Sequence, residues 1–236
     1  MSLQLVVFDL AGTTVEDPGS VNLCLRSALE QAGVTVDSSA VDRVMGLPKP
    51  EAIRCLLETA GRSEALGQVD AIHQDFQNRM RLYYRDDPSV RSVPGVEDLF
   101  ARLKAAGVRI GLDTGFDHTI TKVILDRLGW IEKGLVDAHV SSDQVAVGRP
   151  EPLMIRHLME ATGVTQPDSV AKVGDAPADL LEGKNAGCRW IIGVTWGTHT
   201  RKQLEVWPHT HLVESVEALE AVLQEDPAQP MKQANR

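Results

Sequence analysis

Four short stretches of this chain hold the side chains best suited to chemistry, and each follows an apolar run. Asp9, at the end of such a run, could act as a nucleophile that forms an aspartyl-phosphate. The hydroxyl of Thr114 and the N–H that follows it suit a phosphoryl oxygen. Arg149 offers a positive group for the same phosphoryl group and for the attacked carboxylate. The stretches are residues 9–13 (DLAGT), 113–116 (DTGF), 148–152 (GRPEP) and 174–179 (GDAPAD).

The last stretch predicts a metal site. Asp175 and Asp179 lie one helical turn apart at the start of an expected helix, so both carboxylates face the same edge of the sheet. With Asp9 they form an all-oxygen site of the type that Mg²⁺ prefers. The metal would shield the repulsion between an anionic nucleophile and an anionic phosphoryl group. Taken singly, each of these residues also fits a turn or a helix cap. The ordered set of four, each after a β-run, favours the chemical interpretation.

The apolar pattern predicts the scaffold that brings these stretches together. Buried strands alternate with helical patterns, which predicts an α/β fold with a Rossmann-like parallel sheet covered on both faces. Ligands bind at the carboxyl ends of the strands in such sheets. The expected strands are residues 3–8, 108–113, 136–140, 169–174 and 189–194, with a short edge strand at 210–213. The expected helices are residues 95–106, 117–128, 150–162, 176–186 and 216–223.

The segment between the first two strands differs from the rest because it contains no convincing strand. Its helical patterns lie at residues 21–32, 38–45, 51–60 and 64–85. We interpret it as an inserted α-helical cap domain that opens for substrate and closes to exclude water. A helical subdomain without a moving role is the alternative. The expected division is therefore a core of residues 1–16 and 92–224, a cap of residues 17–91 and a flexible tail at 225–236.

Composition and charge favour a cytoplasmic enzyme that acts on small molecules. The chain has 33 acidic and 24 basic residues, which argues against a nucleic-acid or anionic-membrane partner. No apolar run approaches the roughly 20 residues of a membrane span, and we expect no signal segment. Cys24, Cys55 and Cys188 are odd in number and far apart, which favours a reducing compartment over a disulfide framework.

The ordered motifs resemble those of the haloacid dehalogenase-like (HAD) hydrolase superfamily, and the resemblance covers roughly residues 3–224. Within it the chain most resembles the phosphonoacetaldehyde hydrolases (phosphonatases) and the phosphonatase-like hydrolases. That closer resemblance rests on AGTTV at 11–15, MGLPK at 45–49 and GRP at 148–150. It implies catalytic roles for Asp9, Lys49 and Arg149. It also implies substrate contacts at Gly12, Met45, Gly46, Thr114 and Gly115, and Mg²⁺ ligands at Asp9, Ala11, Asp175 and Asp179.

Ala11 and Lys49 belong to one hypothesis. In phosphatases of this superfamily the residue at the Ala11 position is an aspartate that protonates the leaving group, which contributes roughly 10²–10⁴-fold. A C–P bond instead leaves a carbanion, for which an electron sink is a better remedy. A lysine amine condensed with a neighbouring aldehyde provides one as an iminium ion. The resemblance implies that Lys49 is this lysine.

Local sequence gives Lys49 a reason to be reactive. It lies between Pro48 and Pro50 at or just before a helix N-terminus, where the helix dipole disfavours an ammonium group. Desolvation under a closed cap acts in the same direction. Two alternatives remain open at this point: a cation that binds the phosphoryl group, and a solvated lysine without a role.

Several positions depart from the phosphonatase pattern. Phosphonatases carry a His where this chain has Ala52, a Tyr where it has Phe116, and a Cys near residues 17–20 (DPGS). The substrate aldehyde therefore stays open. His118 and His199 follow two of the strands and could also reach the pocket.

The leading hypothesis is a Mg²⁺-dependent hydrolase of a small phosphonate such as phosphonoacetaldehyde. The first alternative is a phosphatase of small phosphomonoesters. A dehalogenase and a non-catalytic protein that binds a phosphorylated effector are further alternatives. A homodimer through the helix at 21–32 is a further expectation, by resemblance to phosphonatases.

Overall fold

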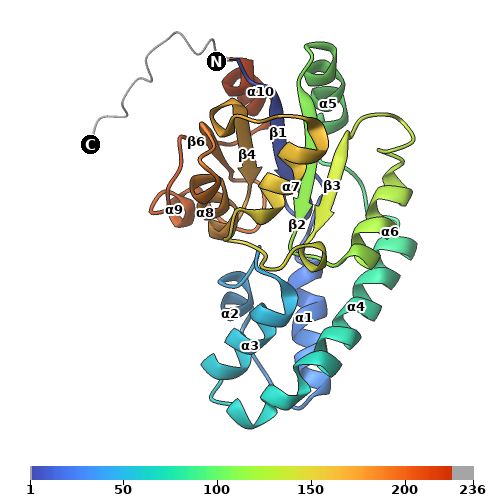
Figure 1. The fold of residues 1–236 in the computed structure, drawn as a ribbon. Coiled ribbons are helices and arrows are strands. Elements are labelled where there is room, and N and C mark those ends of the chain that lie inside the picture. The colour runs from blue at the N-terminus through green and yellow to red at the C-terminus, as the bar shows by residue number, and fades with distance from the viewer. Residues whose placement is uncertain (1, 225–236) are drawn as a thin grey trace.

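The computed structural model describes residues 2–224, so the tail expected at 225–236 lies outside the described residues. Six strands form one sheet in the order β3-β2-β1-β4-β5-β6, and each neighbouring pair is parallel (Figure 1). This confirms the α/β prediction, with each strand boundary within two residues of the expected one. The strands are β1 (Leu5–Asp9), β2 (Arg109–Thr114), β3 (Ala138–Ser141), β4 (Val170–Gly174), β5 (Trp190–Val194) and β6 (His211–Val213).

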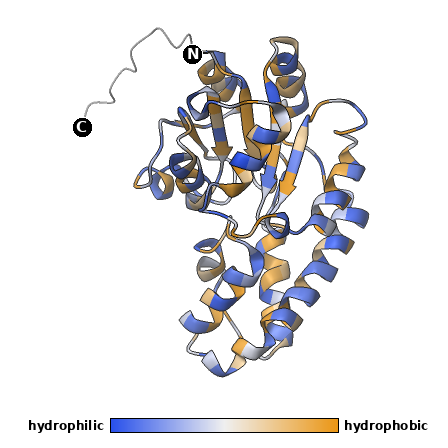
Figure 2. Cartoon of the chain, viewed as in Figure 1, coloured by the Kyte–Doolittle hydropathy of each residue, from blue (hydrophilic) through white to orange (hydrophobic). Residues whose placement is uncertain are grey.

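The central strand β1 is buried on both faces because helices cover the sheet on each side. Val6 and Phe8 belong to one apolar cluster, with α5 (Val96–Ala105) and α10 (Val216–Gln224). Leu5 and Val7 point the other way into a second cluster. Its helices are α7 (Leu153–Thr162), α8 (Pro177–Ala186) and α9 (Arg201–Leu204). Figure 2 shows the resulting pattern, with apolar residues concentrated in the strands and alternating with polar ones along the helices.

Strand order places a crevice beside β1. The chain passes from β1 to β2 and β3 in one direction, and β4, β5 and β6 lie on the opposite side of β1. The helices that leave β1 and β4 therefore diverge at their carboxyl ends, where open α/β sheets bind ligands. Asp9 ends β1, Thr114 ends β2 and Gly174 ends β4, so the predicted stretches meet at this crevice.

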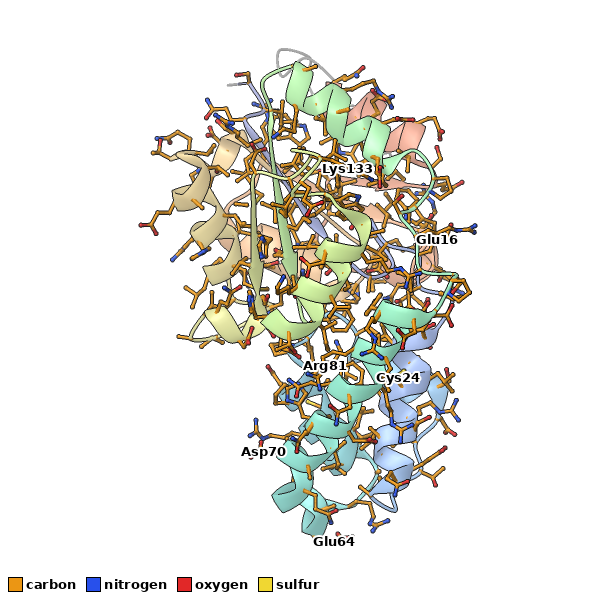
Figure 3. The ribbon with its side chains drawn as sticks, turned by 90° about the vertical axis from the view of Figure 1, so that its right-hand side faces the viewer. Glu16, Cys24, Glu64, Asp70, Arg81 and Lys133 are labelled. Carbon is orange, nitrogen blue, oxygen red and sulfur yellow. The ribbon has the colours of Figure 1, made fainter. Side chains whose placement is uncertain are left out.

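The segment between β1 and α5 is helical, as expected, and gathers at one end of the sheet (Figure 1). Figure 3 shows Glu16 beside the sheet layer, with Glu64 and Asp70 at the far end of the helices. We call residues 17–91 the helical segment. Its elements are α1 (Ser20–Gln31), α2 (Ser38–Asp42), α3 (Lys49–Thr59), the 3₁₀ helix η1 (Ser63–Gln68) and α4 (Val69–Asp86).

Three helix boundaries differ from the predicted ones by three residues or more. The helix expected at 38–45 ends at Asp42, because residues 43–47 form turns in which Gly46 has a φ of 83°. The helix expected at 64–85 begins as the 3₁₀ helix η1. The helix expected at 150–162 begins only at Leu153, because residues 148–152 form a turn in which the Glu151 N–H donates to the Gly148 carbonyl.

Helix α4 joins the helical segment to the sheet layer. It packs against α1 on one side and against α6 (His118–Leu128) on the other. The Arg127 guanidinium of α6 donates to the carbonyls of Tyr84, Arg85 and Asp87, which are at the C-terminal end of α4. The α4 residue Gln77 also donates to Asp117, which caps α6, at 2.9 Å. No helix within residues 2–224 is long and apolar enough to cross a membrane.

Candidate active site

A small cavity lies where the ends of β1 and β2 face the helical segment. Its volume is about 30 Å³, which is room for one or two water molecules. Eight of the predicted site residues line it, from the core and from the helical segment. They are Asp9, Ala11, Met45, Gly46, Lys49, Thr114, Gly115 and Asp175. Four further residues complete the lining: Asp17, Val21, Phe116 and Thr198.

Arg149 lies beneath Asp9 and is fully buried. Its Nη1 is 2.8 Å from Asp9 Oδ1 and 2.9 Å from Asp179 Oδ1, and its Nε is 3.2 Å from Glu182 Oε2. Its Nη2 contacts Asp113. The guanidinium therefore touches the predicted nucleophile, but it is not among the residues that line the cavity. The predicted contact between Arg149 and a phosphoryl group stays a prediction.

A second buried cation, Lys172, was missed by the sequence interpretation. Its Nζ contacts Asp113 and lies 3.2 Å from Asp179 Oδ1 and 3.1 Å from Glu182 Oε2. Burial opposes its charge, but the three carboxyl groups outweigh burial and raise the pKa of Lys172. Burial and Asp113 raise the pKa of Glu182 well above its usual range, although Lys172 and Arg149 act in the opposite direction. The only signal for Lys172 was a charged residue inside an apolar strand.

The predicted metal ligands Asp9, Asp175 and Asp179 do come together, with carboxylate oxygens within 4.8 Å of one another. Burial raises the pKa of Asp9 to about 7 and that of Asp175 to about 6, and the neighbouring carboxylates act in the same direction. A divalent cation would stabilise all of these charges. Ala11 lines the same cavity and can offer only its main-chain carbonyl. The donor set is all oxygen and fits Mg²⁺.

Asp175 is oriented by close packing on both sides. Its Oδ2 accepts a hydrogen bond from the Thr198 N–H at 2.6 Å, and its Oδ1 accepts one from Thr13 at 3.4 Å. A Cβ on either Gly12 or Gly197 would lie 2.4 Å from the same Oδ2. The predicted substrate residue Gly12 therefore leaves room for Asp175 and lies beside the cavity. His199 also contacts the main chain of Asp175, whereas His118 is exposed at the start of α6.

Lys49 is the first residue of α3 and is only 4% exposed. Its Nζ lies 5.2 Å from the centre of the Phe116 ring and 3.4 Å from the Leu47 carbonyl oxygen. Burial lowers the pKa of Lys49 to about 8, although the nearby Asp9 favours the ammonium form. A neutral amine is therefore accessible to Lys49 in mildly alkaline solution, as the sequence interpretation required.

The loop that carries Lys49 sits directly on the core. A Cβ on Gly115 would lie 2.7 Å from the Leu47 carbonyl oxygen, and one on Gly148 would lie 2.5 Å from Pro48 Cγ. Gly46 approaches the start of α8 just as closely, since a Cβ there would lie 3.0 Å from Ala176 Cβ. The structure is therefore a closed arrangement in which small residues let the loop reach the strand ends.

Gly115→Ala is expected to lower kcat/KM by about 10²-fold, because the added methyl group displaces the loop by roughly an ångström. The Leu47 carbonyl is backbone and has little freedom to give way. Steady-state kinetics on any turned-over substrate measures this effect. Gly67→Ala is the control for a change of glycine alone, because a Cβ on Gly67 would meet no atom within 4 Å. Equal kinetics for Gly115→Ala and the wild type would show that loop contact is not needed.

A model of the haloacid dehalogenase-like hydrolase family matches residues 3–187. The phosphonoacetaldehyde hydrolase of Latilactobacillus sakei subsp. sakei (strain 23K) is 35% identical over 199 residues. That match covers 78% of this chain and 73% of the relative.

Solved structures with the same fold include a protein like phosphonoacetaldehyde hydrolase from Oleispira antarctica. It superposes with a TM-score of 0.80 at 21% identity, over 94% of this chain and 92% of that one. A putative phosphoglycolate phosphatase from Lactobacillus delbrueckii subsp. bulgaricus superposes with a TM-score of 0.77 at 22% identity, over 96% and 100%. These likenesses establish the fold and leave the substrate to the chemistry of the cavity.

Proposed function

The chain belongs to the haloacid dehalogenase-like hydrolases, and from this premise we propose that it hydrolyses the C–P bond of a small phosphonate that carries an aldehyde. One observation supports this proposal above the others. The buried Lys49 amine lines the same small cavity as Asp9, and Ala11 stands at the position where phosphatases of this superfamily carry their acid. A nucleophile for phosphorus and an amine for an aldehyde are thus side by side.

The proposed reaction uses both groups in turn. The Lys49 Nζ adds to the aldehyde carbon and loses water, which gives an iminium ion. An Asp9 oxygen then attacks phosphorus while the C–P electron pair moves into the iminium, which leaves an enamine on Lys49 and a phosphoryl group on Asp9. The enamine carbon takes up a proton, and water then releases the aldehyde from Lys49 and phosphate from Asp9.

Other residues hold the groups in place. The Arg149 guanidinium orients Asp9, and Thr114 with the Gly115 N–H offers donors to the phosphoryl oxygens. Asp9, Asp175 and Asp179, with the Ala11 carbonyl, would hold Mg²⁺, which screens the negative charge between nucleophile and phosphoryl group when bound. Phe116 gives the cavity an apolar wall against Lys49.

The volume of the cavity supports a role for the helical segment as a cap. At about 30 Å³ it offers room for one or two water molecules, which is less than a phosphonate of several heavy atoms fills. We infer that the helical segment moves away when substrate enters. Its return would bring Lys49 to Asp9 and exclude water from the reacting groups.

Borohydride is expected to inactivate the wild-type enzyme in the presence of phosphonoacetaldehyde and to leave a reduced adduct on Lys49. The rate of adduct formation should rise with pH up to about 8, where attack by the Lys49 amine limits it, and should not rise further above that value. The pKa of Lys49 is lowered to about 8, and only the neutral amine above that value attacks the aldehyde. Peptide mass mapping after trapping at several pH values measures both the site and the rate.

Two outcomes would contradict the proposal. In one, an adduct on exposed lysines such as Lys122 appears but none on Lys49. In the other, the enzyme releases no phosphate from phosphonoacetaldehyde with Mg²⁺ present. As the control, EDTA should abolish phosphate release and added Mg²⁺ should restore it, which would also separate this enzyme from a dehalogenase.

A phosphatase of small phosphomonoesters is the second candidate, and one observation favours it. Asp17 lines the same cavity as Ala11 and places a carboxyl group where a leaving alkoxide could take a proton. Steady turnover of common phosphate esters without any borohydride-sensitive step would support this reading over C–P cleavage.

A further inference from the structure

We propose that Asp17 is the general acid and base for imine formation and imine hydrolysis at Lys49. This inference rests on the proposed C–P hydrolysis and names a catalytic residue for it. Asp17 lies where the chain passes from β1 into α1, next to Glu16, which Figure 3 shows beside the sheet layer. It lines the closed cavity together with Lys49.

The Asp17 carboxyl group is held so that one oxygen is committed and the other is available. Its Oδ1 accepts hydrogen bonds from the N–H groups of Gly19, Ser20 and Val21 at 3.1, 2.6 and 3.3 Å. Its Oδ2 accepts no hydrogen bond from residues 2–224, and Asp17 is half-buried at the edge of the cavity. A group fixed by three donors keeps its direction, while its second oxygen can give or take a proton.

The other acids at the cavity are occupied. Asp9 and Asp175 belong to the carboxylate cluster that fits a metal, and Asp9 also pairs with Arg149. Asp17 lies outside that cluster. Among the described residues that line the cavity, it is therefore the acid that is free to serve the aldehyde side of the reaction. The Lys49 ammonium counteracts the rise in the pKa of Asp17, and the Asp17 carboxylate counteracts the fall in the pKa of Lys49.

A second cavity gives Asp17 access to protons. It has a volume of about 310 Å³. It lies between the two segments by which the chain crosses from the sheet layer to the helical segment and back. Asp17 lines both cavities, and Gly12, Glu16, Pro94 and Trp196 line only the larger one. Burial raises the pKa of Asp17, so a protonated fraction persists closer to neutral pH. Water in the larger cavity can return a proton to Asp17.

The proton transfers balance over one cycle. When the Lys49 carbinolamine loses water, the Asp17 carboxyl gives its proton to the departing hydroxyl oxygen. The C–O bond breaks, and the nitrogen lone pair forms the C=N bond. When water later adds to the carbon of the product iminium, its C–O bond forms as the C=N electron pair returns to nitrogen. The proton of that water passes to the Asp17 carboxylate, so Asp17 ends the cycle as it began.

Asp17→Asn tests this assignment directly, because an amide keeps an oxygen for the three N–H groups but cannot transfer the proton. We expect the rate of borohydride trapping at Lys49 with acetaldehyde to fall by about 10²–10⁴-fold. Asp87→Asn is the matched control. Asp87 also accepts hydrogen bonds in a turn, from Ser89, but it lines neither cavity, and its trapping rate should equal that of the wild type.

The outcomes separate this inference from the proposed function. If wild type and Asp17→Asn form the Lys49 adduct at rates within twofold of each other, Asp17 has no such role while the imine mechanism stands. If the wild type forms no adduct, the proposed function fails first and the inference falls with it. Should Asp17→Asn unfold, Asp17→Ser retains a capping oxygen and is tested in the same assay after its thermal unfolding is checked.

Discussion

Replacing Lys49 with arginine is expected to lower phosphate release from phosphonoacetaldehyde by at least about 10³-fold, because a guanidinium keeps the positive charge but cannot form an imine. The sequence left two roles open for Lys49: covalent catalysis and ionic binding of the phosphoryl group. These roles predict different activities for the arginine variant. A purely ionic role would leave kcat within about tenfold of the wild type, since arginine binds phosphoryl oxygens at least as well as lysine. Steady-state release of phosphate decides between them.

A second variant is needed because arginine could lower the activity merely by being too large. The cavity is small, and Lys49 is buried within it. Lys49→Met has nearly the same length and no charge. Loss of activity in both variants, with unchanged thermal unfolding, is the expected result. Full activity of Lys49→Arg on the aldehyde substrate would remove the imine from the mechanism. Turnover of phosphate esters that survives both substitutions would favour the phosphatase reading.

Lys172→Met is expected to destabilise the fold by about 3–5 kcal/mol, since it removes one of the two buried cations that pair with the same carboxyl groups and leaves Arg149 to offset them. Lys172 is fully buried, and its Nζ contacts Asp113, Asp179 and Glu182. A loss of this size is a large share of the roughly 5–15 kcal/mol by which domains are stable. Chemical denaturation monitored by circular dichroism measures it.

An exposed lysine supplies the comparison for this prediction. Lys122 pairs with Asp126 on the surface of α6, and Lys122→Met should change the stability by no more than about 0.5 kcal/mol. The double variant Lys172→Met with Asp113→Asn should lose less than the sum of the two single variants, because one positive and one negative charge of the same cluster are then removed together. Additive losses would mean that Lys172 contributes packing rather than charge.

The fold was predictable because each signal was local. A buried strand such as Leu5–Asp9 reads directly as an apolar run, and alternation with helices leaves few topologies. The residues at strand ends could likewise be placed together in advance, since parallel strands bring their carboxyl ends to one edge. That rule places Asp9 and Thr114 together at the small cavity, whereas Lys49 reaches it from α3 of the helical segment.

The residues that sequence reasoning missed depend on tertiary approach. Lys172 contacts Asp113 and Glu182, and the three residues come from three different elements. No spacing in the sequence predicts that they meet. Asp17 was noted only within a stretch that departs from the phosphonatase pattern, because its exposure to the cavity depends on how the chain enters α1. The turn at residues 43–47 escaped prediction for a similar reason. It lies against Gly115, the residue after β2, whose missing side chain leaves room for the Leu47 carbonyl.

The attachment of α4 to α6 has a mechanical consequence. Arg127 holds the C-terminal end of α4, an 18-residue helix, while the N-terminal end of α4 lies far from the sheet layer. A second attachment lies halfway along the helix, where Gln77 donates to Asp117 at the start of α6. A hinge motion that keeps both attachments would involve only the N-terminal half of α4, from Val69 to Gln77. At about 1.5 Å per residue that half is roughly 13 Å long, so a rotation of about 10° would move its far end by roughly 2 Å. A larger displacement of α3, which packs against α4 and carries Lys49, would require these contacts to break, so residues distant from the chemistry limit how far the reactive amine can move.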